Sequence, residues 1–163
     1  MRYHNITKDD MLNGDGLRAV LWVSGCEHRC PNCQNPMTWD ENDGLIFDWY
    51  AMKELADLLQ QDYIHGLTLS GGDPLHPANR EEVYALCCMV KTMFPTKSIW
   101  LYTGYKWEEI CDMRIMECVD VVIDGPYIEQ LRDVQLKWRG SSNQRIIDVK
   151  ASRNNGTVVL YDE

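Results

Sequence analysis

The chain has 163 residues, of which 45% are hydrophobic and 25% charged, and its formal net charge is −9. These values predict one folded soluble domain spanning residues 1–163, exclude a disordered chain and disfavour nucleic-acid binding. No apolar run reaches the ~20 residues that span a bilayer. The opening MRYHNITKDD also lacks the apolar region of a secretory signal, so we expect a cytoplasmic protein without a membrane partner.

Strand and helix patterns alternate along the chain. In order, they predict a strand at 18–24, a helix at 47–61, a strand at 67–70, a helix at 79–94, a strand at 98–103, a helix at 107–117 and a strand at 120–124. Asp48 is an N-cap residue for the first helix, and Asn79 with Glu82 resembles a capping box before the second. Short edge strands could follow at 144–149 and 157–161, and the rest of the C-terminal tail has no clear pattern.

This alternation predicts an α/β fold with a mostly parallel sheet and helices covering it. The roughly four to six strand–helix units are too few to close an eight-stranded barrel, so we expect an open partial (βα) barrel. In such sheets, ligands bind at the carboxyl ends of the strands. The loops at 25–33, 70–73, 103–105 and 124–127 all follow predicted strands. We therefore predict that these loops form one site.

Seven cysteines is a high number for the cytoplasm, where clustered cysteines usually bind metal or take part in catalysis. Cys26, Cys30 and Cys33 form a tight trio with C-x3-C-x2-C spacing. Structural zinc sites and cubane iron–sulfur clusters usually take four protein ligands. Three ligands leave one metal position open, which favours a catalytic site. A structural zinc loop or an electron carrier stays as an alternative and would need a fourth ligand.

The other cysteines lack the spacing of a second cluster, and they are Cys87, Cys88, Cys111 and Cys118. Cys87 lies on the apolar face of its predicted helix and is expected to be a small buried hydrophobic residue. We interpret the remaining three in the same way. His28 lies between two cysteines of the trio, and it either adjusts a metal centre or cofactor contact or is a solvated loop residue.

Five motifs, in order, resemble a known family. They are Gly25-Cys26 through Cys33-Gln34-Asn35, Ser70-Gly71-Gly72-Asp73-Pro74-Leu75, Tyr102-Thr103-Gly104-Tyr105, Asp124-Gly125 and Trp138 to Gln144. The trio followed by the glycine pair resembles the radical S-adenosylmethionine superfamily. The whole set, from about residue 1 to residue 149, resembles the activating proteins of anaerobic (class III) ribonucleoside-triphosphate reductases.

The resemblance implies a glycyl-radical activating enzyme, which is an oxidoreductase. Cys26, Cys30 and Cys33 would hold a four-iron four-sulfur (4Fe-4S) cluster, and its remaining iron would bind S-adenosylmethionine. Reductive cleavage of this cofactor would produce a 5′-deoxyadenosyl radical, which would take a hydrogen atom from a glycine of the reductase. The resemblance also implies a flavodoxin-type protein as the electron donor.

The same resemblance implies contacts to S-adenosylmethionine. Gly71 and Gly72 would let the backbone approach the methionine portion, which a Cβ would obstruct. Asp73 would bind the ammonium group. Backbone groups near the adenine would come from Asn32, Cys33 and Gln34. Asn32 and Asp73 stand where many superfamily members have an aromatic residue and a glutamate, and both variants resemble the reductase-activating subgroup.

Two other functions stay open at this stage. A small radical S-adenosylmethionine enzyme acting on a small molecule would turn over without a protein partner. A non-enzymatic iron–sulfur or zinc module would not bind S-adenosylmethionine. The segment from Arg139 to Gln144 is either an exposed turn or a surface that docks the partner or borders the substrate.

Overall fold

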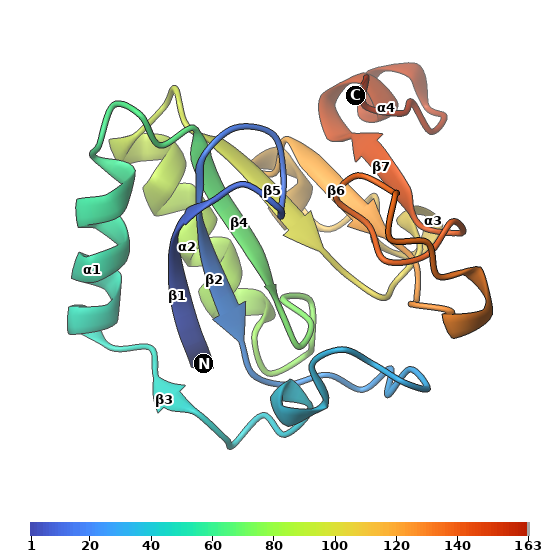
Figure 1. Ribbon diagram of the computed structural model, residues 1–163. Helices are drawn as coiled ribbons and strands as arrows, with labels where there is room; N and C mark the ends of the chain where they lie inside the picture. Colours follow the sequence, from blue (N-terminus) through green and yellow to red (C-terminus); the bar gives the residue numbers. More distant parts are fainter. Residues whose placement is uncertain (163) are drawn as a thin grey trace.

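The computed structural model describes residues 1–162, which form a mixed α/β fold around one seven-stranded sheet (Figure 1). The strands are β1 (Arg2–Asp10), β2 (Arg18–Val23), β3 (Leu45–Ile46), β4 (Gly66–Gly71), β5 (Ser98–Tyr102), β6 (Val121–Asp124) and β7 (Arg145–Asp148). Their spatial order is β3-β1-β2-β4-β5-β6-β7. The central strands β2, β4, β5 and β6 pair in parallel, and β1, β3 and β7 pair antiparallel at the two sides. The α/β class and the parallel centre are confirmed, and closure into a partial barrel stays a prediction.

Helices connect the strands of the described chain. They are α1 (Trp49–Leu59), α2 (Arg80–Met93), α3 (Trp107–Ile110) and α4 (Val149–Asn155), with 3-10 turns at Pro36–Thr38, Arg114–Glu117 and Glu129–Leu131. Asp48 caps α1 as predicted, because its side chain accepts the N–H groups of Tyr50 at 2.9 Å and Ala51 at 3.0 Å. The helix predicted at 107–117 ends early, since the backbone leaves the helical region at Met113, where ψ is 139°.

Two parts of the chain differ from the sequence-based expectation. The apolar pattern does not predict β1, because Tyr3 and Ile6 are the buried residues of this strand and the other positions are partly or fully exposed. Pairing with β2, rather than its own pattern, therefore holds β1 in the sheet. At the C-terminus, the segment 157–161 contributes one bridge, between Leu160 and Ile147, instead of a strand.

The predicted capping box of α2 is wrong. The side chain of Asn79 makes no capping hydrogen bond to this helix. Asn79 is instead buried, and its side-chain amide donates to the carbonyl oxygens of Ser24 at 2.7 Å and Asp73 at 3.2 Å. A buried amide needs such partners. Asn79 therefore joins the loop after β2 to the loop after β4.

The main hydrophobic core lies on the side of the sheet that α1 and α2 cover (Figure 1). Cys87 on α2 is fully buried there, as predicted. In α1 the buried side chains are Ala51, Leu55 and Leu59, whereas Trp49, which the apolar pattern includes, is 67% exposed. Trp49 is the first residue of this helix.

A smaller core on the other side of the sheet is largely aromatic. The ring of Trp100 packs edge-on against Trp138 at 5.0 Å and Tyr161 at 5.2 Å. The guanidinium of Arg18 lies 5.3 Å from the Trp100 ring and is fully buried. It donates to Thr68 Oγ1 at 2.7 Å and to backbone carbonyls, and burial lowers the pKa of Arg18 to about 10. These contacts hold Trp138 and Tyr161 against this face of the sheet.

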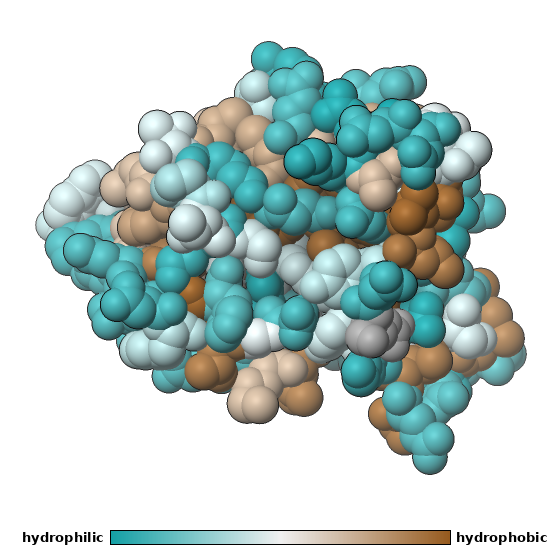
Figure 2. All heavy atoms as spheres, turned by 90° about the horizontal axis from the view of Figure 1, so that it is seen from above, coloured by the Kyte–Doolittle hydropathy of each residue, from teal (hydrophilic) through white to brown (hydrophobic). Residues whose placement is uncertain are grey.

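The surface is mainly hydrophilic when seen from above, with hydrophobic side chains in small separate groups (Figure 2). Scattered apolar residues of this kind are ordinary on a folded protein. Within residues 1–162, none of the helices has both the length and the apolar character needed to cross a bilayer.

Candidate functional site

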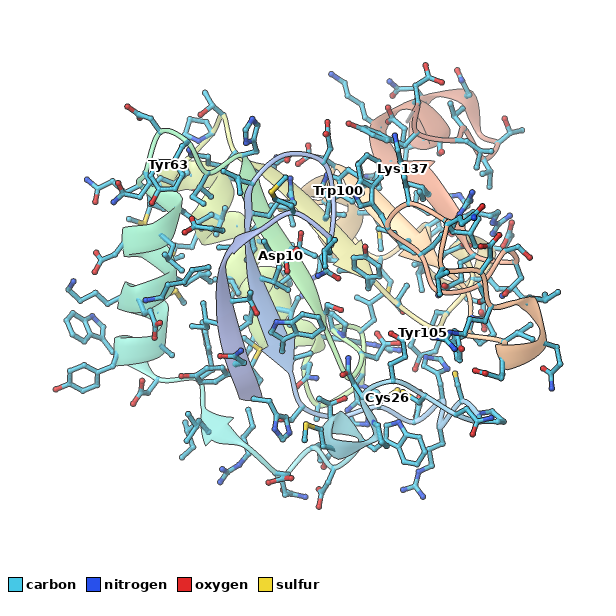
Figure 3. The ribbon with its side chains drawn as sticks, in the orientation of Figure 1. Asp10, Cys26, Tyr63, Trp100, Tyr105 and Lys137 are labelled. Carbon is cyan, nitrogen blue, oxygen red and sulfur yellow. The ribbon has the colours of Figure 1, made fainter. Side chains whose placement is uncertain are left out.

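A cavity of about 800 Å³ lies at the carboxyl ends of the parallel strands. Each of the four predicted loops contributes to its wall, with Cys26 after β2, Gly72 after β4, Gly104 after β5 and Gly125 after β6. Figure 3 shows Cys26 and Tyr105 at this end of the sheet, and Trp100 lies farther back along its strand. The predicted convergence of these loops on one site is confirmed.

Two further segments line the cavity, and of their residues only Trp138, Arg139 and Gly140 belong to a motif found in the sequence. Met11, Leu12 and Asn13, in the turn between β1 and β2, line one side, and residues between 132 and 140 line another. The rim carries highly exposed apolar side chains, since Met11 is 71%, Leu12 80% and Val134 82% exposed. The cavity therefore combines a polar floor at the strand ends with an apolar rim.

The segment from Arg139 to Gln144 is a closed turn, and Arg139, Gly140 and Gln144 of this turn line the cavity. The side-chain oxygen of Gln144 accepts the N–H groups of Gly140 at 2.9 Å and Ser141 at 3.2 Å. Its amide nitrogen donates to the carbonyl of Gly125 at 3.1 Å. This motif thus has a structural role as a turn, and it also places residues at the cavity.

The cysteine loop, residues 25–33, is held at its start by the backbone. Gly25 N donates to Thr38 O at 2.8 Å, and Cys26 N donates to Trp39 O at 3.1 Å. Two residues of this loop that are not glycine, Arg29 and Asn32, have positive φ angles of 45° and 56°. Such backbone is uncommon and is held by its surroundings. The loop is therefore built into the fold rather than being a free connection.

All three cysteines of the trio are free, partly exposed and part of the cavity wall. The thiol of Cys33 accepts the N–H of Asn35 at 3.4 Å. Burial raises the pKa of the Cys26 thiol to about 11, against the opposing effect of backbone N–H groups of His28 and Arg29. A metal centre that binds Cys26 would displace its proton.

The trio supplies three free thiols on one cavity wall, which is one fewer than the four protein ligands that a cubane cluster usually takes. Within residues 1–162, no three side chains of His, Cys, Asp or Glu are gathered closely enough to hold one ion. The cysteines of a cubane each bind a different iron, so they surround a larger object. Three thiols beside a cavity of about 800 Å³ leave room for such a cluster and for a ligand next to it.

The glycine pair lies where the loop after β4 meets the cysteine loop. Gly71 has a φ of 107°, and a Cβ on Gly72 would come within 2.4 Å of the carbonyl oxygen of Gly25. Gly72 N also donates to Val23 O at 2.8 Å, and Asp73 N donates to Gly25 O at 2.7 Å. The absence of a Cβ at these glycines thus permits direct contact between two loops. The sequence does not reveal this reason for having glycine here. Both also line the cavity.

Asp73 lines the cavity, but its side chain is 1% exposed. One carboxylate oxygen accepts the N–H of Leu75 at 2.8 Å. The other lies 3.0 Å from both Thr103 Oγ1 and Gly104 N, and 2.8 Å from His28 Nε2. The hydrogen bond to Asp73 raises the pKa of His28. His28 is therefore a partly buried partner of Asp73 rather than a freely solvated residue, and its predicted effect on a metal centre or cofactor contact stays a prediction.

Of the three residues predicted to lie near the adenine, only two line the cavity. Cys33 and Gln34 line the cavity, whereas Asn32 is exposed and lies outside its wall. The positive φ of Asn32 shows that this residue turns the chain between Cys30 and Cys33. Asparagine adopts that backbone more easily than most other residues.

Asp124, in the predicted Asp124-Gly125 motif, stabilises the fold. It is buried and accepts the N–H of Trp107 at 2.7 Å, which fastens the start of α3. It also pairs with Arg145 at 2.5 Å, and Arg145 pairs with the exposed Glu108 at 2.9 Å. These two carboxylates raise the pKa of Arg145. The motif therefore joins β6, α3 and β7 behind the cavity.

Comparisons with known proteins agree with this geometry. A family described as "4Fe-4S single cluster domain" matches residues 12–147. A relative from Enterobacteria phage T4 is 50% identical over 146 residues, covering 90% of this chain and 93% of that protein. Relatives from Salmonella typhimurium (strain LT2) and Escherichia coli (strain K12) are 43% and 40% identical over 148 residues, covering 88% of this chain and 96% of each protein. All three are named anaerobic ribonucleoside-triphosphate reductase-activating protein.

Proposed function

Because this chain belongs to the family of anaerobic ribonucleoside-triphosphate reductase-activating proteins, we propose that it generates a glycyl radical on an anaerobic ribonucleotide reductase. The observation that carries the proposal is that three free cysteines and a glycine pair line one cavity at the strand ends. Three ligands fit a centre with one open coordination position, which is where a reacting ligand binds.

We propose that Cys26, Cys30 and Cys33 hold a 4Fe-4S cluster and that S-adenosylmethionine binds beside it. When bound, the reduced cluster supplies the electron for cleavage of S-adenosylmethionine, and the resulting 5′-deoxyadenosyl radical takes a hydrogen atom from the reductase glycine. The protein's own residues bind and orient these groups. Gly71 and Gly72 present bare backbone to the cavity, and Cys33 with Gln34 forms the wall where the adenine would lie.

The open mouth of the cavity suits a second substrate that is a polypeptide. Met11, Leu12 and Val134 around the rim are 71%, 80% and 82% exposed, so a partner can cover them on docking. Burying these apolar side chains would stabilise the complex and exclude water from the reaction. We propose that the glycine-containing segment of the reductase enters here and that a flavodoxin-type protein donates the electron.

The test is anaerobic reconstitution with iron and sulfide, followed by reduction and addition of S-adenosylmethionine. We expect methionine and 5′-deoxyadenosine as products, and a glycyl radical signal in electron paramagnetic resonance once the reductase is added. Cys30→Ala should lose the cluster and the products. Cys111→Ala is the matched control, because Cys111 is a free, partly buried cysteine outside the cavity wall.

Three other outcomes would contradict the proposal. A cluster that forms but never cleaves S-adenosylmethionine, even with the reductase present, would indicate an electron carrier. Zinc in place of iron would indicate a structural loop. Rapid turnover of an added small molecule without a glycyl radical on the reductase would indicate the small-molecule enzyme.

A further inference from the structure

The buried carboxylate of Asp73 is held by four hydrogen-bond donors, one on Oδ1 and three on Oδ2. A carboxylate offers about four acceptor sites. In the structure, donors from Leu75, Thr103 and Gly104 lie at 2.8 Å, 3.0 Å and 3.0 Å, and His28 Nε2 lies at 2.8 Å. Because a carboxylate accepts only, Nε2 of His28 carries the proton of this bond. A carboxylate that is 1% exposed and bound by donors from several loops is typical of a structural connection.

These donors come from different loops around the cavity. Leu75 belongs to the loop after β4, like Asp73 itself, and Thr103 and Gly104 belong to the loop after β5. His28 lies in the cysteine loop, 45 residues before Asp73 in sequence. Asp73 is therefore the point at which the three loops are joined.

His28 is enclosed by the loop after β5. Its ring packs edge-on against Tyr105, with 4.5 Å between the ring centroids. A Cβ on Gly104 would lie 2.4 Å from the His28 ring, so the ring rests directly on this glycine. The side chain of His28 is 17% exposed. The hydroxyl of Tyr105 also binds the carboxylate of Glu27, the residue before His28.

We propose that His28 and Asp73 are positioning residues, which fasten the cysteine loop to the loop after β5 and so hold the three thiols at the cavity. On this proposal Asp73 does not bind the ammonium group of S-adenosylmethionine. Breaking the contact loosens the segment from Cys26 to Cys30, because among residues 1–162 His28 is its one side chain that binds Asp73. The contacts of Tyr105 with Glu27 and with the His28 ring also link this segment to the loop after β5. The proposal rests on the proposed function only in taking the trio as cluster ligands.

The first test uses reduced, cluster-free protein, so it does not depend on cluster assembly or activity. The rate of alkylation by iodoacetamide is measured separately for each cysteine by mass spectrometry. In His28→Ala we expect alkylation of Cys26 and Cys30 to rise about tenfold or more, as for loss of a hydrogen bond to a charged group. The fully buried Cys87 reports opening of the whole fold and should not change.

Two further variants make this test specific. His28→Gln keeps an N–H at a similar reach, so we expect its alkylation rates to stay near those of the unaltered protein. His65→Ala is the matched control, because His65 is an exposed histidine at the opposite end of β4. Unchanged rates in His28→Ala would overturn the proposal. An equal rise at Cys87 would also overturn it, by showing that the contact supports the whole fold.

The second test separates positioning by Asp73 from binding of the ammonium group. Asp73→Glu keeps the charge and restores the residue of the superfamily pattern, but the longer side chain does not fit the same four donors. We expect both Asp73→Glu and Asp73→Asn to raise alkylation of the trio in cluster-free protein. If Asp73→Glu keeps slow alkylation and S-adenosylmethionine affinity, while Asp73→Asn loses affinity alone, then Asp73 binds the ammonium group and the proposal is wrong.

The two proposals can fail independently. If the protein never cleaves S-adenosylmethionine but His28→Ala still exposes the trio, the proposed function is wrong and the positioning role holds. If cleavage and radical transfer occur but the alkylation rates do not depend on His28 or Asp73, the proposed function holds and the positioning role is wrong.

Discussion

The seven cysteines occupy two regions with different roles. Cys26, Cys30 and Cys33 lie on an irregular loop in the cavity wall. The other four lie in or beside the helices, and they are Cys87, Cys88, Cys111 and Cys118. Cys87 is fully buried, and the thiols of Cys88 and Cys118 are 3.5 Å apart.

Thiols with a raised pKa occur in both regions, and burial raises the pKa most strongly for Cys87. Burial raises the pKa of Cys26 and of Cys118 to about 11 in each case. What differs is the surrounding backbone. In the cysteine loop the chain has positive φ at Gly25, Arg29 and Asn32, and it brings three thiols to one cavity. In the helical region each thiol packs against the core or against one other thiol. Spacing on a loop, rather than reactivity, therefore predicts a metal site.

The largest expected effect is on iron content. Cys30→Ser should lose essentially all iron after anaerobic reconstitution, because a cluster with two protein ligands is not retained. Cys88→Ser should keep the iron content of the unaltered protein, since Cys88 does not line the cavity. Iron and sulfide assays with visible absorption spectra measure the difference. Equal loss in both variants would remove the distinction between the two regions.

The next effect tests the contact between the cysteine loop and the glycine pair. Gly72→Ala places a Cβ 2.4 Å from Gly25 O and 2.8 Å from Thr38 O, which are backbone atoms that cannot turn aside. We expect a loss of about 1–3 kcal/mol in the free energy of unfolding, as for overpacking of a core. Gly140→Ala is the control, because its nearest neighbour is the side chain of Tyr127 at 3.1 Å. Urea unfolding of cluster-free protein is the measurement, and equal losses would contradict the expected contact.

A smaller effect is expected at the buried end of the helical region. Cys87→Ser puts a hydroxyl into the main core, where the thiol is fully buried. An unpaired buried polar group costs about 1–3 kcal/mol, and serine can lower this cost by donating to a carbonyl of its own helix. Stability should therefore fall while iron content stays unchanged. Loss of iron without loss of stability would show that Cys87 supports the cluster site.

The smallest effect is expected at Cys118, whose thiol is only partly buried beside Cys88. Cys118→Ser keeps a group that can donate a hydrogen bond to the Cys88 thiol or accept one from it. We expect the free energy of unfolding to change by less than about 1 kcal/mol, as for a partly exposed substitution. Denaturant unfolding under reducing, anaerobic conditions gives this value. A loss larger than that of Cys87→Ser would reverse the order of burial seen in the structure.

The sequence alone was sufficient for features that depend on neighbouring residues. The spacing of Cys26, Cys30 and Cys33, the cap at Asp48 and the four central strands are all local patterns. Parallel strands in turn bring the loops after them to one edge, so the location of the site follows from the strand assignments. The burial of Cys87 follows from helical periodicity in the same way.

Only the tertiary structure decided which distant groups meet. Asp73 and Asn79 are ordinary loop and capping residues in sequence, yet the fold buries both of them. Buried polar side chains need hydrogen-bond partners. Asp73 pairs with His28, which is 45 residues away in sequence, and Asn79 pairs with the carbonyl of Ser24, which is 55 residues away. The need for glycine at position 72 likewise comes from the backbone of Gly25. Such pairs are set by how strands and loops pack, and local patterns carry no information about them.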